Sequence, residues 1–237
     1  MSLHTELDGA ATRLRSIEAV ATDYDRTLTT PDLVLRPETV ETVRRARSRG
    51  LKVIIVSGRK IDFLQRTSAY FGGLDALVGE NGGVVQTASG MKLLSRETGE
   101  RIAHLLQSKN VPFEKGMVIS YVDGEYVEAA REAIKGYPFA KLIMNVGAGM
   151  VVPSDVGKEV GLRAALAELG VDESRTVVAG DGENDVSLFD IKGLKVALSN
   201  SVQTLKEKAD IRMELEGGRG LEAVIDEIID LRERNNQ

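Results

Sequence analysis

Short, mostly apolar runs alternate along this chain with longer stretches in which apolar residues recur at helical spacing. Three of the runs are rich in β-branched residues and are typical of buried strands: residues 17–24, 52–58 and 175–180. Helices are expected at residues 37–50, which begin with Pro37, and at residues 156–169, which Gly170 follows. An extra amphipathic helix is expected at residues 3–16. Because strands alternate with helices, the pattern predicts parallel βαβ units.

The pattern changes after Gly83, where the predicted strands become shorter and more polar. Helices are expected here at residues 97–109 and 126–136, and the first pattern resumes at residue 155. The chain is therefore predicted to be an α/β protein, with a Rossmann-like parallel sheet that carries helices on both faces and a smaller inserted α/β cap. The predicted parts are a core of residues 1–80 and 155–237 and a cap of residues 81–154.

Composition narrows the classes of partner. The chain has 237 residues, a formal net charge of -5 and no cysteine. A negative net charge argues against a general affinity for nucleic acid, and the absence of cysteine excludes disulfides and thiolate metal sites. No apolar stretch approaches the roughly 18 residues that a membrane span needs. We expect a cytoplasmic protein without nucleic-acid or membrane partners, and the sequence leaves open whether it is a monomer or a homodimer.

Polar residues follow the ends of the predicted strands. They are Asp23, Asp25, Ser57, Asp181, Asn184 and Asp185. Because the carboxyl ends of strands in a parallel sheet open onto the ligand crevice, we expect these side chains to converge. Lys158, at the start of the helix that precedes the strand at 175–180, is placed to reach the same crevice.

Such a group of carboxylates needs positive charge beside it. Two carboxylates about 4 Å apart repel each other by roughly 4 kcal/mol at an effective dielectric constant near 20. With no histidine or cysteine nearby, the ligands are hard oxygens, which favour Mg²⁺ together with a substrate phosphate. Lys158 adds a second positive charge that suits phosphoryl oxygens. The site is therefore predicted to bind an anion, and a cap that closes over the crevice suits a small phosphorylated metabolite.

The spacing of Asp23 and Asp25 suits a two-step phosphoryl transfer. In an extended chain, residues at i and i+2 project to the same side. One carboxylate can attack phosphorus to form an aspartyl-phosphate, and its neighbour can protonate the leaving group and later activate water. Ser57 and the backbone N–H groups after it can bind a phosphoryl oxygen at a helix N-terminus.

Four segments in this order resemble the haloacid dehalogenase-like superfamily of phosphatases with an aspartate nucleophile. The segments are DYDRTLT, IIVSG, the lysine of VGKEVGL, and GDGENDVSLF, and the resemblance covers most of residues 17–230. The insert after GENGG is similar to the type-two α/β cap of the Cof-like branch. That branch contains archaeal phosphoglycolate phosphatases and sucrose-phosphate phosphatases.

The resemblance implies a role for each candidate residue. Asp23 would be the nucleophile and a magnesium ligand, and Asp25 the general acid and base, with its backbone carbonyl on the metal. Asp181 would bind the metal, and Asp185 would bind it directly or through water. The implied substrate-binding residues are Ser57, Lys158, Asn81 at the cap junction, and Asn184.

Arg26 departs from the family pattern, which usually has glycine directly after the acid and base. If that position takes a positive φ, arginine costs about 1 kcal/mol of backbone strain. Alternatively, Arg26 reaches an anionic tail of the substrate. The sequence does not decide between these two interpretations.

The function expected from the resemblance is that of a magnesium-dependent phosphatase, with phosphoglycolate as the first candidate substrate. A sugar-phosphate phosphatase or a phosphomutase of the same branch is the alternative. From another class, a non-catalytic protein that binds phosphorylated metabolites also fits the residues.

Overall fold

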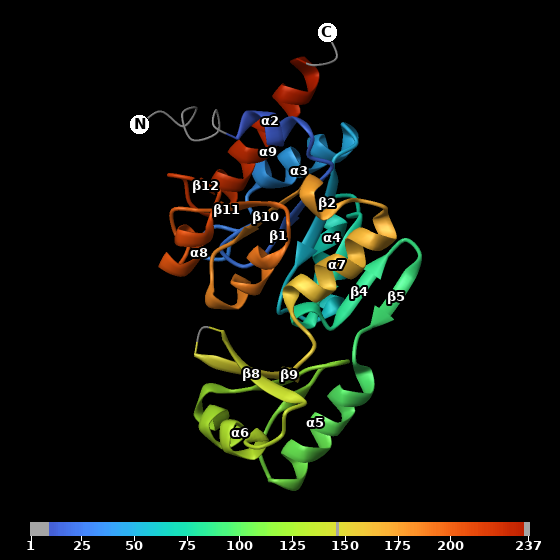
Figure 1. Ribbon diagram of the computed structural model, residues 1–237, viewed down its shortest axis with the longest axis vertical. Helices are drawn as coiled ribbons and strands as arrows, with labels where there is room; N and C mark the ends of the chain where they lie inside the picture. Colours follow the sequence, from blue (N-terminus) through green and yellow to red (C-terminus); the bar gives the residue numbers. More distant parts are fainter. Residues whose placement is uncertain (1–9, 146, 235–237) are drawn as a thin grey trace.

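The computed structural model describes residues 10–145 and 147–234, which form a large upper part and a smaller lower part (Figure 1). Half of the helix expected at residues 3–16 lies outside the described residues, and within the described half α2 covers Ala11–Arg15. None of the helices in the described ranges combines the length and the apolar character that a membrane span requires.

The large part is built on one sheet. Within the described residues it has eight strands, in the order β12-β11-β10-β1-β2-β3-β4-β5. Neighbouring strands from β12 to β3 run parallel, whereas β4 and β5 are antiparallel to their neighbours. The strands are β1 Ala19–Thr22, β2 Lys52–Val56, β3 Ala76–Gly79, β4 Val84–Thr87, β5 Gly90–Leu93, β10 Thr176–Gly180, β11 Leu194–Ala197 and β12 Ile211–Arg212.

Helices cover both faces of this sheet, as predicted (Figure 1). Successive residues of β1 point to opposite faces: Val20 packs in one apolar cluster with Ile228, and Ala21 packs in the other with Leu162. Because neither face is open, all four residues of β1 are buried, which explains why Thr22 is its only polar residue. The helices of this part are α2, α3 Pro37–Ser48, α4 Ile61–Tyr70, α7 Lys158–Leu169, α8 Gln203–Lys208 and α9 Gly217–Arg234.

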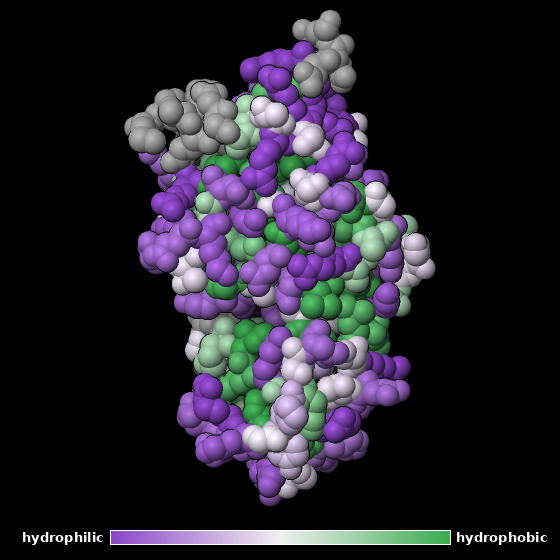
Figure 2. Space-filling view, viewed as in Figure 1, coloured by the Kyte–Doolittle hydropathy of each residue, from purple (hydrophilic) through white to green (hydrophobic). Residues whose placement is uncertain are grey.

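The smaller part is an antiparallel four-stranded sheet in the order β6-β7-β9-β8, as far as the chain is described. In Figure 1 this sheet lies toward the large part, and its helices lie on the far side. On the face shown in Figure 2, most of the surface is hydrophilic, and hydrophobic residues gather near the junction of the two parts. The elements are α5 Arg96–Ser108, β6 Glu114–Lys115, β7 Ser120–Val122, α6 Val127–Ile134, β8 Ala140–Asn145 and β9 Ala148–Pro153.

The strands β4 and β5 fall within residues 81–154, the stretch expected to form the cap, yet they extend the large sheet beside β3. The residues of β5 are mostly exposed, since β5 is the edge strand of the large sheet. This short, exposed strand therefore matches the short strands with surface character that were expected in the cap. We propose that the boundary of the cap lies after β5 rather than at residue 81.

Glu80 ties the cap to the core. It lies between β3 and β4, is 1% exposed, and its carboxylate accepts hydrogen bonds from the backbone N–H groups of Met117, Val118 and Ile119 at 2.8, 2.8 and 3.1 Å. Glu80 and Asn81 have φ angles of 51° and 53°, in the left-handed region. A strained pair of residues thus places one buried anion where it satisfies three donors of the cap.

We predict that Glu80→Gln lowers the free energy of unfolding by about 2–3 kcal/mol, because an amide replaces a charged acceptor and turns an N–H group toward donors. Urea unfolding measures the change. Glu128→Gln, at an exposed cap position, is the matched control and should unfold like the wild type. Equal stabilities of the two variants would contradict this role of Glu80.

Candidate active site

Three carboxylates meet where two neighbouring strands end. Asp23 follows β1, Asp181 follows β10, and Asp185 lies in the short 3₁₀ turn Glu183–Asp185. Because β1 and β10 pair in parallel, with Thr22 opposite Ala179, Asp23 and Asp181 both emerge at the same edge of the sheet, with Asp181 one position further along its strand. Each carboxyl group offers an oxygen within 4.8 Å of the others, and all three residues are buried. The convergence expected from the sequence is therefore present for these residues.

Lys158 lies inside this cluster. Its Nζ donates hydrogen bonds to Asp23 Oδ1 at 2.7 Å and to Asp185 Oδ1 at 2.5 Å, and its side chain is fully buried. The other oxygen of Asp185 accepts from the backbone N–H groups of Asp181 and Gly182 at 3.0 and 2.9 Å. Both oxygens of Asp185 are thus engaged within the chain, where they orient the lysine and the turn after β10.

The electrostatics of the cluster leave negative charge to be balanced. Burial raises the pKa of Asp23 to about 8, against the effect of Lys158. Burial and the Asp185 carboxylate raise the pKa of Asp181 to about 6. Burial alone would lower the pKa of Lys158, but Asp185 and Asp23 outweigh it and raise that pKa, so the lysine stays charged. Lys158 and the guanidinium group of Arg26, whose Nε lies 3.1 Å from Asp181 Oδ2, carry two positive charges against three carboxylates, so the cluster favours a further proton or cation.

The donor set fits a hard divalent cation. The available ligand atoms are carboxylate oxygens, with no histidine or cysteine among them, which suits Mg²⁺ better than softer metals. Thr27 Oγ1 lies 3.3 Å from Asp181 Oδ1 and donates to it. Asp181 Oδ2 lies 3.1 Å from Arg26 Nε, so an ion held by Asp23 and Asp181 would share the Asp181 carboxylate with Thr27 and Arg26.

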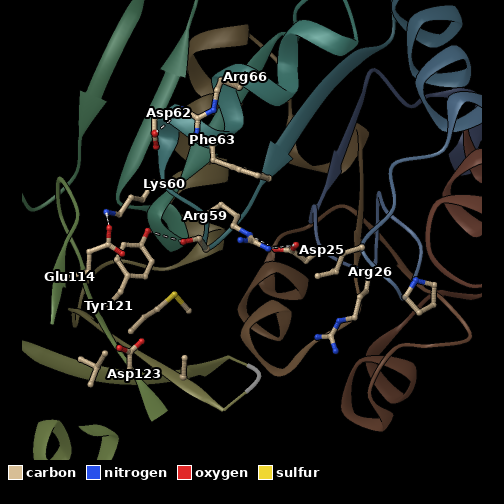
Figure 3. Close-up of a pocket in the computed structure, with 17 residues that line it drawn as sticks. Asp25, Arg26, Arg59, Lys60, Asp62, Phe63, Arg66, Glu114, Tyr121 and Asp123 are labelled. Carbon is tan, nitrogen blue, oxygen red and sulfur yellow. Dashed lines mark hydrogen bonds and ion pairs between the residues drawn. The ribbon is translucent and has the colours of Figure 1, made fainter. Parts of the chain in front are cut away.

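The carboxyl group of Asp25 points elsewhere. Both of its oxygens accept hydrogen bonds from Arg59, from Nε at 2.9 Å and from Nη2 at 2.8 Å (Figure 3). Asp25 and Arg59 line a cavity of about 690 Å³ between the core and the cap. The side chains of the two aspartates of DYD thus lie in different surroundings, because Asp23 faces Lys158 and Asp25 faces the cavity.

The loop after β2 connects the cluster to the cap. Tyr121 of β7 donates its O–H group to the carbonyl of Gly58 at 3.0 Å, and burial raises the pKa of this tyrosine. A Cβ on Gly58 would lie 3.2 Å from the sulfur of Met150, so glycine permits this close approach. Lys60 forms an ion pair with Glu114 of the cap at 2.5 Å. The cap is therefore docked against this loop.

The other residues expected to bind substrate lie beside the same loop. Ser57 is 1% exposed, and its Oγ accepts from the backbone N–H of Arg59 at 3.3 Å. The N–H of Asn81 donates to the carbonyl of Ser57 at 3.0 Å, and the buried Asn81 Oδ1 has no hydrogen-bond partner among the described residues. The Nδ2 of Asn184 lies 4.0 Å from where a Cβ on Gly58 would be.

Sequence reasoning missed Arg59 and Glu80. Both residues adjoin motifs that the sequence already marked, because Arg59 follows Ser57 by two positions and Glu80 precedes Asn81. Their partners, however, lie 34 and 37 residues away. Their positions next to these motifs could have marked Arg59 and Glu80 as candidates. Their hydrogen-bond partners could not be predicted, because these depend on the fold.

Comparisons with known proteins agree with this geometry. Phosphoglycolate phosphatase 2 of Saccharolobus solfataricus is 29% identical over 221 residues, which cover 89% of this chain and 91% of that protein. A phosphoglycolate phosphatase of Archaeoglobus fulgidus is 27% identical over 216 residues, which cover 86% of this chain and 93% of that protein. Archaeal phosphoglycolate phosphatases are thus among its relatives, as the resemblance implied.

The fold is shared with solved structures of lower identity. A Thermoplasma acidophilum protein superimposes with a TM-score of 0.77 at 20% identity, covering 91% of this chain and 99% of that chain. A haloacid dehalogenase-like hydrolase from Bacteroides thetaiotaomicron gives a TM-score of 0.75 at 17% identity, covering 90% and 99%. The family model described as haloacid dehalogenase-like hydrolase matches residues 20–142 and 117–221, and the chain belongs to this family.

Proposed function

We propose that this protein is a phosphatase that depends on a divalent cation, for which Mg²⁺ is the first candidate, and that it hydrolyses phosphoglycolate. The observation that carries the proposal is the buried ammonium group of Lys158 between Asp23 and Asp185, at the edge where β1 and β10 end. A charged lysine that is already held beside a carboxylate can also hold a phosphoryl oxygen close to that carboxylate. The names of the archaeal relatives support the choice of substrate.

Asp23 is the proposed nucleophile. One of its oxygens forms a bond to phosphorus while the bond from phosphorus to the substrate oxygen breaks, which gives an aspartyl-phosphate and an alkoxide. A water molecule then attacks the phosphorus, releases inorganic phosphate and restores the Asp23 carboxylate. Lys158 stays bonded to Asp23 Oδ1 in the free protein, which fixes the orientation of the attacking group.

Asp25 is the proposed general acid and base. It gives a proton to the departing alkoxide and takes one from the attacking water. In the free protein both of its oxygens accept from Arg59. Asp25 therefore has to leave this pair, at least in part, before it donates a proton. We infer that a bound substrate, by drawing Arg59 toward its own negative charge, frees Asp25 for that step.

Asp23 and Asp181 would hold the divalent cation, with the backbone carbonyl of Asp25 and a water on Asp185 as further proposed ligands. When bound, the cation neutralises charge on the carboxylates and on the phosphoryl oxygens. The cap supplies the other side of the site. A cavity of about 690 Å³ with Arg26, Arg59 and Lys60 in its lining suits a small, negatively charged metabolite.

The first prediction concerns substrate and nucleophile. With Mg²⁺ present, phosphate release from phosphoglycolate should exceed release from glucose and mannose phosphates at least tenfold in kcat/KM, and EDTA should abolish it. Asp23→Asn should lower kcat by a factor of a thousand or more, because the amide is a poor nucleophile. Asp32→Asn, an exposed aspartate nine positions later, is the control with wild-type turnover.

Other outcomes of this assay point to the alternatives. If sugar phosphates were hydrolysed faster than phosphoglycolate, a sugar phosphate would be the substrate instead. Conversion of one sugar phosphate into another, without free phosphate, would identify a mutase. A complete lack of turnover with these compounds and with a generic aryl phosphate would favour a non-catalytic binding protein.

The second prediction concerns cation binding and pH. Protons on Asp23 and Asp181 compete with a cation, and these groups have pKa values raised to about 8 and about 6 in the cation-free protein. The affinity for Mg²⁺ should therefore rise between pH 5 and pH 8, and binding should release protons in this range. Titration calorimetry in buffers of different ionisation enthalpy measures both effects. An affinity independent of pH would contradict the assignment of these ligands.

The third prediction concerns Lys158 as the internal counter-ion. Lys158→Met should lower the free energy of unfolding by about 3–5 kcal/mol at pH 8, because two buried carboxylates lose their partner. The loss should shrink at pH 5, where the raised pKa of Asp23 allows that carboxylate to bind a proton. Urea unfolding in EDTA at both pH values measures this, with Lys192→Met at an exposed position as the control. An equal loss of unfolding free energy at both pH values would mean that lost packing, rather than unpaired charge, destabilises Lys158→Met.

A further inference from the structure

Arg26 has an unusual backbone that is held firmly in place. Its φ angle of 59° lies in the left-handed region, which glycine adopts far more easily than arginine. The N–H group of Arg26 donates to Thr29 Oγ1 at 2.8 Å, and its carbonyl accepts from Asn200 Nδ2 at 2.8 Å. The surrounding structure therefore fixes this turn, and the strain expected for a non-glycine residue is present.

The guanidinium group of Arg26 lies between the carboxylate cluster and the cavity. Its Nε is 3.1 Å from Asp181 Oδ2, and its side chain is 34% exposed. Arg26 also lines the cavity between core and cap, where it projects away from the pair of Asp25 and Arg59 (Figure 3). One side chain thus touches the proposed cation site and borders the space for the substrate.

Four basic residues line this cavity, and they differ in their partners. Arg59 pairs with Asp25, Lys60 with Glu114, and Arg66 with Asp62. The partner of Arg26 is Asp181, a member of the cluster that offers its oxygens within 4.8 Å of one another. Asp181 would pair less strongly with Arg26 if it also held a divalent cation, because the two positive charges would compete for one carboxylate. The cation site therefore acts directly on the pairing of Arg26.

We propose that Arg26 determines substrate specificity by binding a carboxylate on the leaving group of the substrate. In the free protein its guanidinium pairs with Asp181. When a cation engages Asp181, the guanidinium turns to the cavity and binds the planar carboxylate of the substrate through paired N–H groups. This inference rests on the proposed phosphatase function and names the substrate class as small phosphomonoesters that carry a carboxylate. A glycine at position 26 would relieve the strain and would lose this contact.

The test uses two probes that cannot be hydrolysed. They are 3-phosphonopropionate and propylphosphonate, which share a phosphonate and a three-carbon chain and differ in a terminal carboxylate or methyl group. Calorimetry with Mg²⁺ gives the preference of each protein for the carboxylate, as the ratio of the two dissociation constants. The wild type should prefer 3-phosphonopropionate at least tenfold.

Arg26→Gln should reduce that preference at least fivefold. The preference of Arg26→Lys should lie between those of the wild type and Arg26→Gln, because lysine keeps the charge but loses the planar fork. Arg66→Gln is the matched control, since Arg66 lines the same cavity and pairs with an exposed aspartate, and it should retain the full preference. Arg26→Gly should show the same loss as Arg26→Gln with a melting temperature at least as high. This result would show that the loss does not come from misfolding.

A second readout follows Mg²⁺ alone. Arg26→Gln should bind Mg²⁺ more tightly than the wild type by a factor of several, because a competing positive charge is removed from Asp181. An unchanged carboxylate preference in Arg26→Gln, or no preference in the wild type, would overturn the inference. Because these measurements need no turnover, a protein that shows the preference but releases no phosphate would refute the phosphatase proposal alone.

Discussion

The site depends on one buried interaction, the two hydrogen bonds from the ammonium group of Lys158 to Asp23 and Asp185. Three buried carboxylates in mutual contact would repel one another strongly without a counter-ion. The lysine reduces that repulsion, and the cluster still keeps enough negative charge to attract a cation. Its position at the first residue of α7 also links the helix that follows the cap to the strands that carry the aspartates. Lys158 thus contributes both to the charge balance of the cluster and to the connection between the cap and the core.

The two parts of the chain meet at the loops after β2 and β3. The carboxylate of Glu80 accepts three backbone donors of the cap, and Tyr121 donates to Gly58 on the neighbouring loop. These contacts place the cavity directly beside Asp25 and Arg26. The loops after β2 and β3 therefore position the cap beside the loop after β1, which carries Asp25 and Arg26.

Several features could be predicted from local sequence, and the reasons are physical. The parallel sheet with helices on both faces followed from short β-branched runs alternating with amphipathic stretches, and the structure confirms it. The convergence of Asp23, Asp181 and Asp185 followed from their position after strand ends. Short elements escaped prediction: β6 and β12 have two residues each, too few for any periodicity. The strand β5 falls within the predicted cap because it is short and, as an edge strand, exposed, like the strands expected there.

The sequence by itself determined which residue types stand at the strand ends and therefore the class of chemistry, because chain direction and hydrophobic pattern are local properties. Only the tertiary structure decided how these residues are paired. The partner of Asp25 is Arg59, the partner of Arg26 is Asp181, and Glu80 reaches the cap. Each of these pairs joins segments that are distant along the chain, and many other partners of suitable charge exist in the sequence. The choice among them depends on strand order and on the docking of the cap, which no local pattern encodes.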